Sequence, residues 1–221
     1  MEFQEMRRGF FITLEGPEGS GKSSQAKALV ATLRRAGHRV TFACDPGTTS
    51  LGTHVRRVLL HEKNALTPMA EALLFIAGRV QLVEEQIRPA LKRGRIVICD
   101  RFHDSTVAYQ GYGGGLNVAW LDQLDRRAIN NLMPSLTILL DVPTDVGFAR
   151  LHRRKASGPT GRKARRDRME QKTLAFHRRV RNGYRALARR EPRRMILLDA
   201  TQSKAALQRA IAALVIRRVS R

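Results

Sequence analysis

Residues near the start of the chain, Gly16-Pro17-Glu18-Gly19-Ser20-Gly21-Lys22-Ser23, have the types and spacing of a phosphate-binding P-loop. Glycines let backbone N–H groups approach phosphate oxygens, and the helix that follows directs its partial positive charge at them. Lys22 is expected to reach the β- and γ-phosphates, and the Ser23 hydroxyl to bind Mg²⁺. We predict an ATP site formed by Gly16, Pro17, Glu18, Gly19, Ser20, Gly21, Lys22, Ser23 and Ser24.

A second pair with chemical potential, Asp100-Arg101, directly follows an apolar run at residues 95–99. In an open parallel sheet the carboxyl ends of the strands face the ligand crevice. An aspartate there can hold Mg²⁺ or its waters, and an arginine can grip a phosphate with two hydrogen bonds. We therefore predict that Ser23 and Asp100 bind Mg²⁺, and that Lys22 and Arg101 are catalytic.

The third feature is a basic segment at residues 153–168, which is interrupted by Gly158, Pro159 and Gly161. Glycine and proline break regular structure, and the like charges repel one another. Phosphoryl transfer relies on positioning and on cationic stabilisation of the phosphate oxygens. A mobile basic lid that closes over ATP would supply this stabilisation and exclude water. A solvated charge run or a nucleic-acid-binding arm is the alternative reading.

These residues need a scaffold, and short β-branched-rich runs alternate with segments of helical spacing. The predicted strands are Phe10–Glu15, Arg39–Ala43, Arg95–Cys99, Leu136–Asp141 and Met195–Leu198. The predicted helices are Lys22–Arg35, Leu51–Leu60, Pro68–Arg93, Val118–Leu132, Thr144–Arg154, Arg168–Arg190 and Ser203–Val219. The alternation predicts a three-layer α/β fold of the P-loop NTPase type, in which helices flank a five-stranded parallel sheet and a basic lid is attached.

Composition limits the class of protein. The 221 residues suit a single domain, 1–221, with the lid at about residues 153–168. There is no apolar stretch long enough to span a bilayer and no apolar core of a secretory signal, so we expect a cytoplasmic protein without a membrane partner. The formal net charge of +22 favours anionic ligands, with nucleotides and nucleic acids both candidates. Cys44 and Cys99 are interpreted as reduced thiols.

The order of four motifs resembles the thymidylate kinase family over nearly the whole chain. They are the P-loop stretch Phe11 to Ser24 with Glu18 inside it, the helix segment Phe75-Ile76-Ala77-Gly78-Arg79, the stretch from Asp100 to Gly111, and Asp167-Arg168-Met169-Glu170. The stretch Asp100-Arg101-Phe102-His103-Asp104-Ser105-Thr106-Val107-Ala108-Tyr109-Gln110-Gly111 is the most specific of them.

The resemblance implies roles for individual residues. Phe75 would stack on the thymine ring, and Arg79, one helical turn later, would hydrogen-bond a base carbonyl. Tyr109 would pack against the sugar where a ribose 2′-OH would collide, which would select deoxyribose. The remaining expected contacts are Ser105, Thr106 and Gln110 along the base edge, Glu18 at the sugar 3′-OH, Arg101 at the acceptor phosphate, and Asp45 in the turn after the second strand.

The positions of the arginines indicate which type of family member the chain resembles. There is no arginine between Gly16 and Lys22, whereas several lie in the basic segment, so the chain resembles family members with catalytic arginines in the lid. Arg153 and Arg168 are the predicted catalytic pair. Two departures are visible: Cys44 stands where the family often has an arginine, which shifts acceptor-phosphate binding toward Arg101, and the lid is long for the family.

The reaction implied is ATP plus dTMP giving ADP plus dTDP, for dTTP synthesis, with Mg²⁺ bridging the phosphates. One methyl group in a pocket is worth about 1–3 kcal/mol, so a kinase of dUMP, UMP or CMP remains an alternative. A nucleic-acid-binding P-loop ATPase is the alternative from another class, favoured by the net charge and by the basic segment at residues 153–168. We expect no stable nucleic-acid partner, because aromatic residues are only 5% of the chain. The resemblance implies a homodimer.

Overall fold

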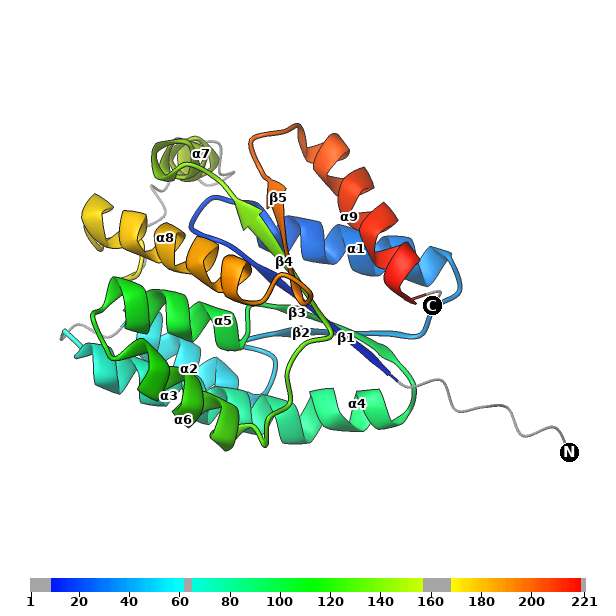
Figure 1. Cartoon of the computed structure of the whole chain (residues 1–221), viewed down its shortest axis with the longest axis horizontal. Coiled ribbons are helices and arrows are strands. Elements are labelled where there is room, and N and C mark those ends of the chain that lie inside the picture. The colour runs from blue at the N-terminus through cyan, green and yellow to red at the C-terminus, as the bar shows by residue number, and fades with distance from the viewer. Residues whose placement is uncertain (1–8, 62–64, 157–167, 220–221) are drawn as a thin grey trace, which may run out of the picture.

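The computed structural model describes residues 9–61, 65–156 and 168–219, and its centre is a parallel sheet (Figure 1). The strand order is β2-β3-β1-β4-β5, and every neighbouring pair is parallel. The strands are β1 (Phe10–Glu15), β2 (Val40–Cys44), β3 (Ile96–Asp100), β4 (Leu136–Asp141) and β5 (Met195–Asp199). The predicted fold class is confirmed, and the carboxyl ends of β1 and β3 lie side by side in the sheet's centre.

Both faces of the sheet are covered, because successive strand residues point to opposite sides. Ile12 and Leu14 of β1 pack with the apolar faces of α1 (Lys22–Arg35) and α9 (Lys204–Val219). Phe11, between them in sequence, packs on the other side with residues 82–90 of the long helical segment. Strands buried on both faces read as continuous apolar runs, which is why β1, β3 and β4 were recognisable from sequence.

Further helices complete the outer layers and flank the ligand edge of the sheet. They are α2 (Ser50–His61), α3 (Pro68–Leu82), the π-helix η1 (Val83–Ile87), α4 (Arg88–Lys92), α5 (His103–Thr106), the π-helix η2 (Val107–Gly113), α6 (Val118–Ala128), α7 (Thr144–Ala156) and α8 (Leu174–Arg190). The α2 helix packs on α3, and α8 packs on η2. Because α3, η1 and α4 follow one another without a break, the predicted helix Pro68–Arg93 is one continuous helical segment whose middle is π-helical.

Two helix boundaries were predicted wrongly, and one helical segment was missed. The helix expected from Arg168 begins at Leu174, because the Thr173 side chain accepts a hydrogen bond from Phe176 N and caps it there. The helix expected to reach Leu132 ends at Ala128, before Asn130 and Asn131 with φ of 51° and 53°. The helical turns formed by residues 103–113 were not predicted as a helix at all.

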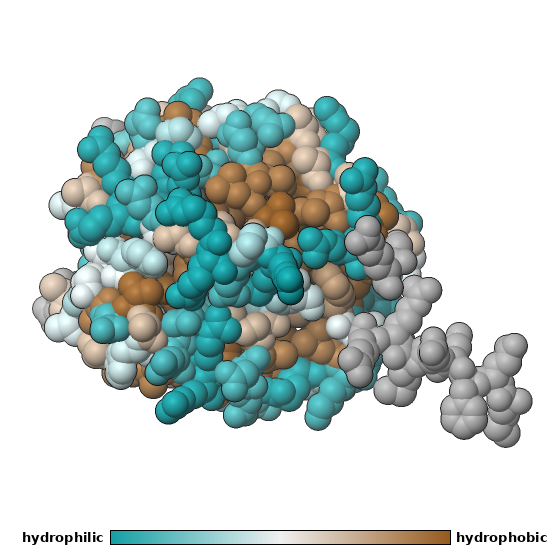
Figure 2. Space-filling view, in the orientation of Figure 1, coloured by the Kyte–Doolittle hydropathy of each residue, from teal (hydrophilic) through white to brown (hydrophobic). Residues whose placement is uncertain are grey.

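The described surface is largely hydrophilic on the face shown in Figure 2, with apolar side chains gathered where Figure 1 shows β5 and α9. Leu197 on β5 and Ile216 on α9 are exposed. Among residues 9–61, 65–156 and 168–219, no helix combines the length and the apolarity needed to cross a membrane.

Candidate active site

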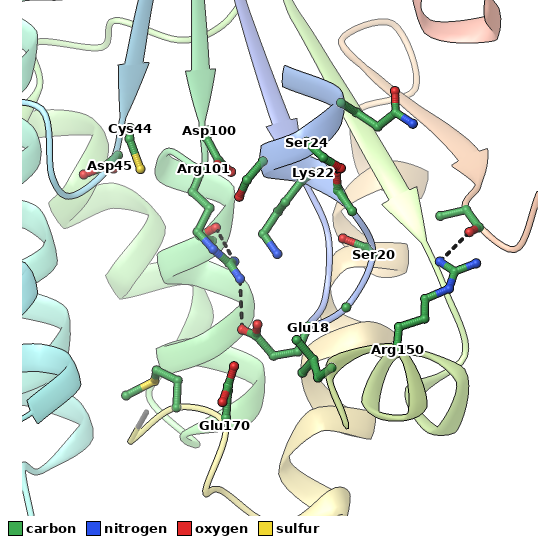
Figure 3. A pocket seen from close by; sticks show the side chains of 18 of the residues that line it. Glu18, Ser20, Lys22, Ser24, Cys44, Asp45, Asp100, Arg101, Arg150 and Glu170 are labelled. Carbon is green, nitrogen blue, oxygen red and sulfur yellow. Dashed lines mark hydrogen bonds and ion pairs between the residues drawn. The ribbon is translucent and has the colours of Figure 1, made fainter. Parts of the chain in front are cut away.

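A pocket of about 1060 Å³ opens at the carboxyl edge of the sheet (Figure 3). Its wall combines the loop after β1, the ends of β2 and β3, part of α7 and the loop between β5 and α9. Segments far apart in the sequence therefore share one cavity. Residues 18–24 of the predicted ATP site line this pocket, as do Phe75, Ser105, Thr106 and Gln110 of the predicted base site.

The P-loop lies between β1 and α1, as predicted, and its glycines are needed sterically. Gly19 has a φ of +72°, and a Cβ there would lie 2.1 Å from the backbone oxygen of Gly147 at the start of α7. Lys22 Nζ donates to Pro17 O at 3.1 Å, so the lysine lies across its own loop. Burial, together with the charge of Arg101, lowers the pKa of Lys22 to about 8 despite nearby carboxylates. A bound polyphosphate would oppose that shift by attracting the protonated amine.

Arg101 is held above the pocket by four hydrogen bonds and an unusual backbone angle. Its φ is 69°, in the left-handed region that non-glycine residues rarely adopt. One terminal nitrogen donates to Ser105 Oγ at 3.1 Å and to the Tyr184 hydroxyl at 3.2 Å. The other donates to Glu18 Oε1 and to the Tyr109 hydroxyl, both at 3.0 Å. A fixed, planar guanidinium of this kind is suited to binding a phosphate.

Glu18 is a fixed carboxylate opposite Arg101 (Figure 3). The Tyr109 hydroxyl donates to Glu18 Oε1 at 2.7 Å. Burial would raise the pKa of Glu18, but the charges of Lys22 and Arg101 and the tyrosine hydrogen bond together lower it to about 2. Glu18 is therefore an anion at neutral pH. It pairs with Arg101, the cation that is expected to bind the acceptor phosphate.

The expected base contacts come together at the other end of the pocket. Phe75 on α3 lines it, together with Ser105 and Thr106 on α5 and Gln110 in η2. The Ser105 hydroxyl is already engaged, since it donates to Glu15 Oε2 at 2.6 Å. A π-helix rotates side chains relative to a regular helix and is common at functional sites. Here it carries both Tyr109 and Gln110 toward the pocket.

Arg79 lies behind this wall rather than on its surface. Its side chain is 1% exposed, and Nε donates to Asp45 Oδ2 at 2.5 Å. One terminal nitrogen binds Asp125, and the other donates to Thr106 Oγ1 at 2.8 Å. Asp45 and Thr106 line the pocket, so Arg79 lies one layer behind two other predicted substrate-binding residues.

The two predicted lid arginines occupy different places. Arg153, near the end of α7, is exposed and lines the pocket. Arg168 Nε donates to Leu59 O at 2.9 Å, and another of its nitrogens pairs with Glu71 at 2.9 Å. The structure brings Arg168 to the base end of the pocket. The rest of the predicted lid, residues 157–167, lies outside the described residues.

Several residues of the site were missed by the sequence reasoning. Glu15, wholly buried, accepts from Phe102 N at 2.7 Å and from the Tyr184 hydroxyl at 2.9 Å, as well as from Ser105. Burial and the charge of Asp104 raise the pKa of Glu15 to about 7. The sequence signal that could have identified Glu15 is that it is a glutamate at the end of an otherwise apolar predicted strand. Glu15 anchors the loop that carries Arg101.

The sequence-based prediction of the ATP site was also incomplete. Arg150 on α7 lines the pocket and donates to Ala200 O at 2.8 Å, which ties α7 to the loop after β5 (Figure 3). Residues 200–204 of that loop form the adjoining wall. A loop without a motif gives no sequence signal, so only the fold reveals this subsite.

A magnesium ion fits the residues at the end of β3. Asp100 lines the pocket and is 5% exposed, and its Oδ1 atom has no hydrogen-bond partner among the residues that the structure describes. The predicted second ligand, Ser23, lines the same pocket from the start of α1. No cluster of three acidic, histidine or cysteine ligands occurs in the part of the chain that the structure describes. Magnesium at nucleotide sites commonly uses one or two protein ligands plus phosphates.

Comparisons with known proteins give one answer. The thymidylate kinase family model matches residues 14–211. Thymidylate kinase of Deinococcus radiodurans is 47% identical over 96% of this chain and 99% of its own, and that of Thermomicrobium roseum is 52% identical over 87% of each. The crystal structure of thymidylate kinase from Ehrlichia chaffeensis superposes with a TM-score of 0.72 at 30% identity, covering 96% of this chain and 98% of that one.

Proposed function

The chain belongs to the thymidylate kinase family, and from this membership we propose how its own residues carry out the family's reaction. It is an ATP-dependent kinase that phosphorylates dTMP to dTDP. The observation that carries the proposal is the single pocket wall on which the P-loop, Arg101 and the base residues meet. We propose that ATP lies at the P-loop end and dTMP at the end lined by Phe75.

ATP would be held by residues 16–24, and also by Arg150 and residues 200–204, which the sequence did not predict. Lys22 would bind the β- and γ-phosphates with its protonated amine. The adenine would lie against Arg150 and the loop at residues 200–204, because a guanidinium plane stacks on aromatic rings. Mg²⁺ bound by Ser23 and Asp100 would neutralise developing charge on the phosphate oxygens. Asp100 Oδ1, which no described residue contacts by a hydrogen bond, supports this assignment.

The acceptor would be positioned rather than chemically activated. Its phosphate oxygen is already ionised near neutral pH, so no general base is required. Arg101 would bind this phosphate, displacing its contact to Glu18, which could then turn to the sugar 3′-OH. Tyr109 would cover the sugar, and Phe75 would stack on the base. Alignment of the two phosphates is the main contribution of these residues.

The lid would complete the site. We propose that the whole chain, 1–221, is one kinase domain with a lid at about residues 153–168. Arg153 lines the pocket near the proposed phosphates, which supports a catalytic role for it. Arg168 pairs with Glu71 near the proposed base, so its catalytic role would require it to leave that carboxylate. Closure would exclude water and limit hydrolysis of ATP.

We propose further that the enzyme is a cytoplasmic homodimer without a stable nucleic-acid partner. Exposed apolar side chains gather on α2, α3 and α6, which are neighbours in Figure 1. They are Leu51, Val58, Met69, Leu73 and Trp120. Exposed apolar side chains on adjoining helices are typical of a subunit interface. The free cysteines Cys44 and Cys99 fit a reducing compartment.

The decisive test of the site is ADP release from Mg·ATP with a panel of acceptors: dTMP, dUMP, UMP, CMP, dCMP, thymidine and single-stranded DNA. Turnover should be highest with dTMP. If another nucleotide gave the highest turnover, the P-loop assignment would survive and the base pocket would be wrong. If only DNA stimulated hydrolysis, the basic charge would indicate a nucleic-acid-dependent ATPase instead.

A further inference from the structure

Glu15, at the end of β1, is wholly buried and is not among the described residues that line the pocket. Its Oε2 atom accepts from Ser105 Oγ at 2.6 Å and from the Tyr184 hydroxyl at 2.9 Å. The same two hydroxyl oxygens accept from one terminal nitrogen of Arg101, at 3.1 Å and 3.2 Å. Two hydroxyls therefore lie between a buried carboxylate and the cation that is expected to bind the acceptor phosphate.

The protons of these hydroxyls have one direction. A guanidinium only donates and an ionised carboxylate only accepts, whereas each hydroxyl carries a single proton. The two hydroxyl oxygens are also 2.9 Å apart, so one hydroxyl can pair with the other. In every such arrangement the protons run toward Glu15, and lone pairs face Arg101. The charge of Glu15 thereby makes Ser105 and Tyr184 acceptors for Arg101.

Glu15 also fixes the main chain beside Arg101. Its Oε1 atom accepts from Phe102 N at 2.7 Å, and Arg101 N donates to Leu14 O at 3.1 Å. These contacts hold Arg101 at a φ of 69°, which non-glycine residues rarely adopt. One carboxylate thus holds both the backbone that carries Arg101 and the acceptors for its side chain.

The two terminal nitrogens of Arg101 have different surroundings. One is held by the two hydroxyls, while the other donates to Glu18, as Figure 3 shows, and to the Tyr109 hydroxyl. In the proposed function the acceptor phosphate replaces Glu18 at the second nitrogen. The first nitrogen then remains the fixed end of the guanidinium while the substrate binds.

We propose that Glu15 is a positioning residue for the acceptor phosphate, acting on Arg101 through the hydroxyls of Ser105 and Tyr184. The inference rests on the proposed function, in which Arg101 binds that phosphate. Glutamine at this position reverses the arrangement, because Phe102 N requires the amide oxygen and leaves the amide N–H groups facing the hydroxyls. The hydroxyl protons then point at Arg101, donor against donor, and the guanidinium loses its fixed end.

The test is the affinity for dTMP relative to thymidine, which lacks the phosphate, measured by isothermal titration calorimetry without ATP. Burial and the charge of Asp104 raise the pKa of Glu15 to about 7, so titrations at about pH 8.5 examine the ionised carboxylate. Glu15→Gln should lower the ratio of the thymidine Kd to the dTMP Kd at least about tenfold, because hydrogen bonds to charged groups are strong. The thymidine Kd itself should not change.

Equal weakening of both ligands by Glu15→Gln would mean that the pocket as a whole is disturbed, and it would overturn the inference. The matched control is Glu85→Gln, the same substitution at an exposed position of η1. Its ratio should stay within about twofold of wild type.

Arg101→Met separates the inference from the function on which it rests. It should lower the ratio at least as much as Glu15→Gln, and adding Glu15→Gln to it should have no further effect. If wild type bound both ligands equally, or if Arg101→Met kept the preference for dTMP, the proposed placement of the phosphate would fail and the inference with it. If Arg101→Met lost the preference and Glu15→Gln kept it, only the positioning role would be wrong.

A second variant covers the case in which Glu15→Gln does not fold. Tyr184→Phe removes one of the two hydroxyls and keeps the ring that packs in the core. It should lower the ratio about threefold or more, the range of a single hydrogen bond. An unchanged ratio in folded Tyr184→Phe would overturn the inference.

Discussion

At the scale of single residues, the site depends on a few charges whose positions are tightly fixed. Lys22 is the clearest case, because it is buried inside the P-loop and its amine donates to Pro17 O. Arg101 is the second, being held by four hydrogen bonds before any substrate arrives. Pre-organised charges of this kind lower the barrier without reorganisation during the reaction.

We expect Lys22→Ala to reduce turnover by roughly 100- to 1000-fold or more while leaving the fold intact, because it removes a cation aimed at the transferred phosphate. Steady-state ADP release measures the turnover, and circular dichroism confirms folding. Arg35→Gln, in the last turn of the same helix and exposed to solvent, is the control and should retain full activity. A folded Lys22→Ala protein with normal turnover would exclude the assigned role.

His103 makes stability depend on pH. Burial alone would lower its pKa, but hydrogen bonds to Asp122 and Asp125 and the charges of Asp125 and Asp104 raise the pKa to about 9. The unfolded imidazole titrates near 6.5. A pKa raised by folding stabilises fully below pH 6.5 and loses that stabilisation as pH rises to about 9.

Between pH 6 and pH 9.5 we therefore expect the unfolding free energy of wild type to fall by about 3 kcal/mol more than that of His103→Gln, which cannot titrate. Urea denaturation across this range measures both proteins. Parallel curves would show that folding does not raise the pKa of the His103 imidazole.

The sequence predicted the residues that line the pocket better than the residues behind them. Lys22, Arg101 and Gln110 belong to motifs with a chemical signature, and the structure brings all three to one pocket. Glu15 and Glu71 act only through partners distant in sequence, so no local pattern marks them. Arg79 was expected to bind the base directly, and that role remains a prediction. Its position behind Thr106 results from tertiary packing, which no local sequence pattern reveals.

At the scale of elements, the contact between η2 and α8 determines where Tyr109 and Gln110 lie. Glycines allow the two helices to approach closely. A Cβ at Gly183 would lie 2.6 Å from Cγ of Tyr112, and one at Gly113 would lie 2.7 Å from Cγ2 of Val180. The α8 helix therefore supports the pocket from behind, although none of its residues is among those that line the pocket.

We expect Gly183→Ala to destabilise the protein by about 1–3 kcal/mol, because the added methyl group must displace the half-buried ring of Tyr112. Thermal unfolding measures the loss. The control on the same helix is Asn182→Ala, which is exposed and should change stability by no more than about 0.5 kcal/mol. Equal melting temperatures for wild type and Gly183→Ala would show that the helices can separate freely.

Elements differed in how well the sequence predicted them. Strands β1 and β4 were predicted to the residue, since they are continuous apolar runs bounded by polar residues. Residues 103–113 were read only as a motif, because its Asp, Ser, Thr and Gly residues have weak helix propensity. Tertiary contacts around Glu15 hold this segment in helical form.

At the scale of the whole molecule, the apolar surface on α2, α3 and α6 predicts a dimer. Sedimentation at micromolar concentration should show a species of twice 24.9 kDa. Trp120→Glu, on α6, should convert it to monomer by placing a charge in the interface. Ile216→Glu is the control, being similarly exposed but on α9. A wild-type monomer would refute the interface, as would equal dissociation of both variants.

The strand order has a consequence for how the catalytic machinery comes into existence. Strand β1 precedes the P-loop, and its partners in the sheet are β3 and β4, so Thr13 must pair with Cys99 and with Thr137. Such pairings between distant parts of a chain form slowly, because loop closure must precede them. A partly folded chain therefore has no nucleotide site. ATP can bind only the finished structure, and it acts on the folding equilibrium by mass action rather than as a template.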